Sequence, residues 1–131
     1  MEENLIAHLL ADSGLSALVS TRVHPGSLPQ DSALPAVVVN RISGAPQYDD
    51  KGETGLNEAR IQLDCWAGTY SLAKLVARAV IARLSAFDGA VGTTVFVHIM
   101  LESERDTRET GGNAAEHLFR TSLDFNIWTQ P

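Results

Sequence analysis

Carboxylates are the side chains of this sequence best suited to chemistry, and they gather in two stretches that contain glycine. Residues 44–57 include Asp49, Asp50 and Glu53, and residues 102–116 include Glu102, Glu104 and Asp106. Such oxygen ligands bind divalent cations when a fold brings them together. Neither stretch has a metal-binding spacing, and Arg105 and Arg108 offset part of the charge. We therefore interpret these acids as solvated charges of exposed loops and predict no metal site.

The other reactive side chains form no catalytic pattern. His8, His24, His98 and His117 lie in separate segments, without the spacing of a helical zinc motif. The single cysteine, Cys65, lies among the apolar positions of a predicted strand, where a small buried side chain is expected. No phosphate-binding loop, nucleophile elbow or dinucleotide fingerprint occurs. The sequence predicts no catalytic residue and no cofactor, so an enzyme is not expected.

Residues 59–87 change hydrophobic period in mid-course, and the rest of the chain is arranged around them. In residues 59–67, apolar side chains alternate with mostly polar ones, as in a half-buried strand. A helix follows, with Thr69 or Ser71 as its N-cap and an end near Gly89. Its apolar stripe is Leu72, Leu75, Val76, Ala79, Val80 and Leu84. Since this stripe should cover a sheet, Leu75→Asp is expected to abolish folding.

The remaining segments predict a short helix over residues 3–13, a possible edge strand over 22–25, and strands over 36–43, 93–101 and 117–129. Residues 26–35, 44–57 and 102–116 are predicted to be loops. This order indicates an α+β fold with two layers. A largely antiparallel sheet of about four strands would pack on one long helix, with a short N-terminal helix beside it.

The second face of this sheet is predicted to carry Gln62, Asp64, Trp66, Ser122, Asp124, Asn126 and Trp128. Two tryptophans on an uncovered face indicate a partner surface, because tryptophan is enriched at interfaces. The alternative, that the N-terminal helix covers them, stays open at this point. With the charged loops, the candidate interface residues are Trp66, Trp128, Tyr48, Asp49, Asp50, Glu53, Glu104, Arg105, Asp106 and Arg108.

Size and charge limit the remaining possibilities. With 131 residues, the chain is expected to form one domain, residues 1–131. Its 16 acidic and 10 basic residues give a net charge of −6, which disfavours binding of nucleic acid through phosphate contacts. No signal peptide or membrane-spanning segment is predicted, so we expect a cytoplasmic protein without membrane contact.

Several short motifs, taken in order, resemble the tail-completion (tail-terminator, head–tail joining) proteins of long-tailed phages and prophages. They are RVHPG at residues 22–26, LPAVV at 34–38, ARIQLDCWA at 59–67, LESERD at 101–106 and FRTSLDF at 119–125. The resemblance runs over almost the whole chain, and the strand that contains Cys65 and Trp66 is its most specific part.

This resemblance implies an α+β subunit of a ring, usually of six copies, at the head-proximal end of a tail tube. Such a homo-oligomer stops tube growth and contacts the tail-tube protein on one side and the head connector, or stopper, on the other. DNA crosses the ring without sequence-specific binding. The implied location is the tail–neck region of the virion, after assembly in the host cytoplasm. A monomeric adaptor and a small enzyme on a ferredoxin-like scaffold remain as alternatives.

Overall fold

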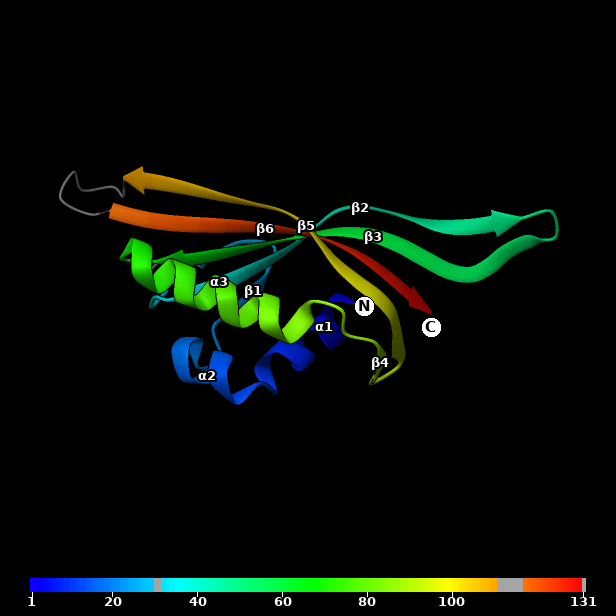
Figure 1. Cartoon of the computed structure of the whole chain (residues 1–131), viewed down its shortest axis with the longest axis horizontal. Helices are drawn as coiled ribbons and strands as arrows, with labels where there is room; N and C mark the ends of the chain where they lie inside the picture. The colour runs from blue at the N-terminus through cyan, green and yellow to red at the C-terminus, as the bar shows by residue number, and fades with distance from the viewer. Residues whose placement is uncertain (30–31, 111–116, 131) are drawn as a thin grey trace.

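The fold is taken from a computed structural model that describes residues 1–29, 32–110 and 117–130, without the side chains of residues 53, 54, 109, 110 and 117. Its helices are α1 (Glu2–Leu10), α2 (Ser13–Val19) and α3 (Tyr70–Leu84). Its strands are β1 (Val23–Pro25), β2 (Ala36–Asp49), β3 (Gly52–Ala67), β4 (Gly89–Val91), β5 (Thr94–Thr110) and β6 (His117–Gln130). All three helices lie on one side of a twisted sheet (Figure 1).

The sheet has six strands in the order β1-β2-β3-β6-β5-β4. The β1–β2 pair is parallel and the other pairs are antiparallel, so the sheet is mixed. The predicted arrangement of about four strands on one long helix is therefore wrong. Strands make up more of this chain than the hydrophobic pattern indicated, because two predicted loops are strands.

The first of these segments, residues 44–57, forms the outer part of the long β2–β3 hairpin. A tight turn joins the strands, where Asp49 Oδ1 accepts a hydrogen bond of 2.8 Å from the Lys51 N–H. Gly52 follows with φ 117°, a conformation that favours glycine. A two-stranded ribbon is held by main-chain pairing and needs no buried face. The apolar pattern that marks a sheet strand is therefore absent from this segment.

The second segment, predicted as a loop over residues 102–116, continues β5 as far as Thr110. β5 pairs with β6 along this whole length, with Arg105 opposite Ser122 and Arg108 opposite Phe119. Arg105 of this segment faces away from the helices, whereas Glu104 and Asp106 face α3. Residues 111–116, the rest of that predicted loop, lie outside the described residues.

The core lies between the helices and one face of the sheet. Ile61, Leu63 and Cys65 of β3 are fully buried there, as their alternation predicts. Leu5 and Leu9 of α1 belong to the same core. The N-terminal helix therefore packs on the face opposite Trp66 and Trp128 and does not cover them.

The face of α3 that packs on the core differs from the predicted apolar stripe. Its buried residues are Ala73, Val76, Ala77, Val80 and Leu84. Leu75 is 49% exposed and points away from the sheet. The expectation that Leu75 belongs to the core is wrong, because small alanines take the positions nearest the strands and rotate the stripe.

Capping residues explain the helix limits. Thr69 accepts a hydrogen bond of 3.2 Å from the Leu72 N–H, which confirms one of the two predicted caps of α3. The helix ends at Leu84, before the predicted end near Gly89, and β4 follows. At the N-terminus, Asp12 accepts a bond of 2.9 Å from the Leu15 N–H and starts α2. The predicted helix over residues 3–13 is therefore present as α1, which ends at Leu10, and α2 follows as a second helix that was not predicted.

Two further segments bear on the fold. β1, predicted as a possible edge strand, pairs with β2 at one edge of the sheet. The loop predicted over residues 26–35 includes residues 30 and 31, which lie outside the described residues. No helix in the described part of the chain is long and apolar enough to cross a membrane.

Candidate functional site

The face of the sheet opposite the helices, here called the outer face, is mainly polar. β3 contributes Arg60, Gln62, Asp64 and Trp66, β5 contributes Ser103 and Arg105, and β6 contributes Ser122, Asp124, Asn126 and Trp128. Strand alternation places these side chains outward, because their neighbours in sequence fill the core. All seven residues predicted for this second face lie on it.

The two tryptophans do not form one apolar patch. Trp66 lies beside Arg120 on β6, whereas Trp128 lies beside Glu58 on β3. Eight residues therefore separate them along the strands, which corresponds to roughly 26 Å. Both side chains are half-buried, and the Arg120 guanidinium lies 5.2 Å from the centre of the Trp66 ring. The sequence predicted that both tryptophans lie on the same face of the sheet. Their separation along the strands follows only from the register between β3 and β6.

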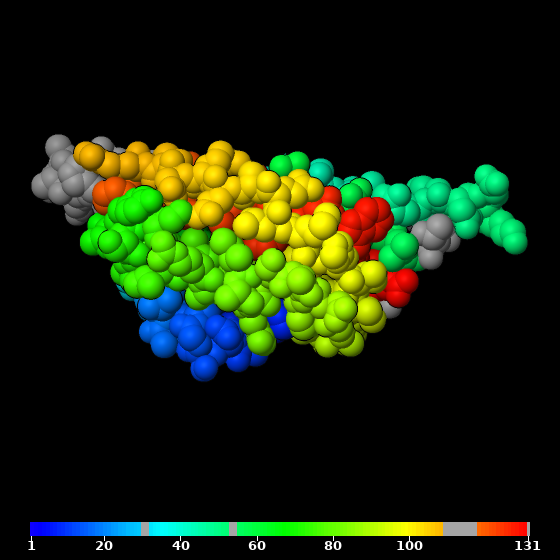
Figure 2. Space-filling view, in the orientation of Figure 1, coloured from blue at the N-terminus to red at the C-terminus, as the bar shows by residue number. Residues whose placement is uncertain are grey.

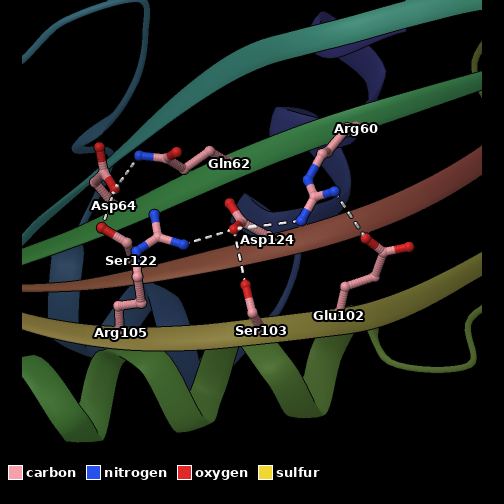
Figure 3. A network of polar contacts seen from close by, with 8 residues as sticks. All are labelled: Arg60, Gln62, Asp64, Glu102, Ser103, Arg105, Ser122 and Asp124. Atoms are coloured by element: carbon pink, nitrogen blue, oxygen red, sulfur yellow. Dashed lines mark hydrogen bonds and ion pairs between the residues drawn. The ribbon is translucent and has the colours of Figure 1, made fainter.

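A network centred on Asp124 fills the middle of the outer face (Figure 3). One carboxylate oxygen of Asp124 accepts hydrogen bonds of 2.8 Å from Ser103 Oγ and from Arg105 Nη1. Arg60 lies 3.7 Å from the same oxygen and also forms an ion pair of 3.2 Å with Glu102. The network joins three strands through side chains, in addition to their main-chain pairing.

These contacts decide the charge of Asp124. Burial alone would raise the pKa of Asp124, which is 5% exposed. Hydrogen bonds from Arg105 and Ser103, with the charges of Arg105 and Arg60, lower the pKa below its ordinary value of 3.8. The carboxylate is therefore ionised at neutral pH and cannot act there as a general acid.

Two further pairs complete this surface. Asp64 accepts hydrogen bonds from Ser122 (2.6 Å) and from Gln62 (2.9 Å). Asn126 donates a bond of 2.9 Å to Glu58. A depression of about 250 Å³ lies next to Glu58, and it is lined by Ser43, Gly44, Ala45, Glu58, Arg60, Glu102 and Asn126. Around this depression, Arg60 and Glu102 form an ion pair and Glu58 accepts the bond from Asn126, so each charged group has a partner within the surface.

The predicted site residues of β5 divide between the two faces. Arg105 points outward to Asp124, whereas Glu104 and Asp106 point toward α3. Lys74 of α3 donates to Glu104 at 2.5 Å and to Asp106 at 3.3 Å. Bonding to Glu104, and more weakly to Asp106, raises the pKa of Lys74 above 10.5. These acids fix the helix to β5 and are not free loop charges, contrary to the sequence interpretation.

The other charged candidates lie at the opposite end of the molecule. Tyr48 and Asp49 end β2, and Asp50 stands in the turn. Glu53 pairs with Tyr48 through the main chain of β3, but its side chain lies outside the described residues. Figure 2 shows this hairpin projecting from the body. The two charged segments of the sequence therefore do not come together.

We call residues 44–57 of this hairpin the arm. β6 ends beside the start of the arm, since Asn57 pairs with Thr129. From this pair to the tip, the arm consists of β2 and β3 alone, as far as the described residues show. Tyr48 is 66% exposed, the largest fraction among the exposed large apolar side chains. The arm is thus a two-stranded extension of the sheet, with a large exposed aromatic side chain near its tip.

The structure provides no set of residues for metal binding or covalent catalysis within the described ranges. No group of three or more His, Cys, Asp or Glu side chains there could hold a metal ion. Cys65 is fully buried, and burial raises the pKa of its thiol far above the ordinary value. A thiol in this state is neither a nucleophile nor a metal ligand.

Sequence reasoning missed part of this arrangement. It did not identify Ser103 and Arg60 as partners of Asp124, or Lys74 as the partner of Glu104 and Asp106. In a strand over residues 103–108, every second side chain would face the same way, which would have separated Arg105 from Glu104 and Asp106. The segment has no alternating apolar residues, so the sequence did not indicate a strand there.

Comparison with known proteins gives a consistent result. The family model described as "Tail completion protein gp17" matches residues 3–130. Among solved structures, a chain from "Virion of native gene transfer agent (GTA) particle" superposes with a TM-score of 0.76. That chain is 23% identical in sequence, and the match covers 100% of this chain and 95% of that one. No curated protein sequence matches the chain.

The structural match shows a shared fold, and the family model shows which family the sequence is related to. Its match begins at α1 and ends at the last residue of β6, so it includes the core, the outer face and the arm. The chain therefore belongs to the family of tail completion proteins.

Proposed function

We propose that this protein forms a ring, with six copies, at the head-proximal end of a phage-like tail tube. There it ends growth of the tube and joins the tail to the head connector. Its partners are further copies of itself, the tail-tube protein and the connector or stopper protein. It acts in the tail–neck region of the particle, after assembly in the host cytoplasm.

The family match over residues 3–130 is the observation that carries this proposal. The similar fold of a chain from a gene transfer agent virion supports a place in a virion. The paired charges of the outer face also support a structural role, because they offer no free acid, base or nucleophile among the described residues.

The shape of the subunit supports assembly. A ring subunit needs two different lateral surfaces for its neighbours and two axial surfaces for other proteins. The arm and the β5–β6 hairpin extend from the body in opposite directions (Figure 1). We propose that Tyr48, Asp49, Asp50 and Glu53 of the arm, Glu104, Arg105, Asp106 and Arg108 of β5, and Trp66 and Trp128 of the outer face lie at or near these contacts.

The net charge of −6 supports a passage for DNA without adhesion. Proteins that hold DNA do so largely through arginine and lysine contacts to phosphates. Like charge between the ring and the duplex would leave DNA free to move through it. Sequence-specific contacts are therefore not part of the proposal.

Electron microscopy of particles made without this protein tests the proposal. Cells that encode the particle but lack this gene should produce tubes of irregular, excessive length and filled heads without tails. Supplying the gene in trans should restore tails of uniform length and their attachment. Normal joined particles in its absence would refute the proposed role.

A further inference from the structure

The structure has an open β-edge on each side of the sheet. β1 covers β2 only at Val37–Val39, where Pro25 has no N–H to continue the pairing. From Asn40 to Asp49, β2 pairs with β3 alone among the described residues. Over about ten residues, β2 therefore has a neighbouring strand on one side only among the described residues, and this free edge runs out along the arm.

The opposite side of the sheet is similar. β4 covers β5 at Thr94–Phe96, and the Ala86 N–H donates a bond of 3.0 Å to the Ile99 carbonyl. From Met100 onward, β5 pairs only with β6 within the described ranges. This second free edge is about as long as the first and runs out along the β5–β6 hairpin.

The two edges have the directions needed to pair with each other. β2, β3, β6 and β5 alternate in direction, so β2 and β5 run oppositely. β2 runs from the body toward the tip of the arm, and β5 runs from the body toward the other hairpin (Figure 1). In two copies of the same orientation, β2 of one and β5 of the next are therefore antiparallel. The two free edges lie at opposite ends of the sheet, so they come side by side when the next copy is shifted along the strand direction.

The exposed apolar side chains agree with this pairing. Tyr48 lies near the tip of the arm and is 66% exposed, and Met100 begins the free edge of β5 and is 44% exposed. If two antiparallel edges of equal length overlap fully, the end of one meets the beginning of the other. Tyr48 of one copy then lies beside Met100 of the next, so both lose contact with water.

We propose that the arm of one copy adds to the free edge of β5 in the next copy, as an antiparallel strand pair that joins neighbours in the ring. The occupant of each free edge is thus a second copy of this chain. This contact uses different surfaces on the two partners, so it can close a ring. The inference rests on the proposed ring and specifies its lateral contact.

Cysteine cross-linking tests the contact. Tyr48→Cys and Met100→Cys proteins, carrying different tags, are mixed, assembled with tail tubes and treated with a short bis-maleimide. The mixed dimer is expected in about tenfold excess over the product of either variant alone, because each position meets only the other. Native Cys65 is fully buried and does not react.

A Leu75→Cys protein mixed with Met100→Cys protein is the matched control. Leu75 is exposed on the side of α3 that is turned away from the sheet, so this pair should give only background product. Dimers of Met100→Cys alone would show β5-to-β5 pairing and overturn the inference. Assembled rings without the mixed dimer would overturn it while leaving the ring in place. A protein that never assembles would refute the proposed function itself.

Discussion

Val76→Asp is expected to abolish folding. The Val76 side chain is fully buried and belongs to the apolar core between the helices and the sheet. An unpaired carboxylate placed there costs several kcal/mol, a large share of the roughly 5–15 kcal/mol that stabilises a typical domain. Far-ultraviolet circular dichroism should show no cooperative thermal transition.

Leu75→Asp provides a matched control one residue away. Leu75 is 49% exposed, so an aspartate there remains in water and lowers the free energy of unfolding by less than about 1 kcal/mol. The two variants place the same charge on the same helix and differ only in the face. A normal melt for Val76→Asp, or loss of folding for Leu75→Asp, would contradict the packing of α3 described above.

Shortening the arm is expected to prevent joining of heads to tails without unfolding the subunit. Replacing residues 47–55 with an Asn–Gly turn keeps the hairpin closed but removes Tyr48. The deleted residues lie outside the buried core, and shorter loops cost little entropy to close. The midpoint of thermal unfolding should therefore change little, while joined particles fall to the level seen without the protein.

The measurement combines a thermal melt with counts of joined particles in micrographs. A control variant, Lys51→Gly, changes only the turn and so keeps the length of the arm and its candidate contact residues. It should join heads to tails at the natural level. Natural yields of joined particles from the shortened protein would exclude the arm from assembly.

The central part of the fold could be predicted from sequence because its residues obey a strong hydrophobic period. In β3, Ile61, Leu63 and Cys65 alternate with polar neighbours, and all three are buried. Thr69 breaks the period and caps α3. Where one face of a helix or strand packs on the core, its apolar residues recur with the period of that helix or strand.

The two long hairpins could not be predicted in the same way. Residues 44–57 and 102–110 form strands whose described side chains meet water or paired charges, so no apolar alternation marks them. Their glycines, proline and charges are also typical of loops. Main-chain pairing, which depends on the partner strand, decides their structure.

The sequence predicted which side chains lie on the outer face, but not which of them contact one another. Alternation placed Asp64, Asp124 and both tryptophans outward, as the structure has them. The contact of Asp124 with Arg105 depends on β5 lying beside β6 in one register. Because Trp66 and Trp128 lie at opposite ends of these strands, the single large apolar patch expected from their sequence positions does not form.

The mass of the protein in solution, with and without tail-tube protein, is the most direct test of the proposed ring. One chain has a mass of 14.1 kDa. A discrete species is expected at a whole-number multiple of this value, sixfold for the proposed hexamer, either alone or when tubes are added. A protein that stays at 14.1 kDa in both conditions and does not bind tubes would contradict it.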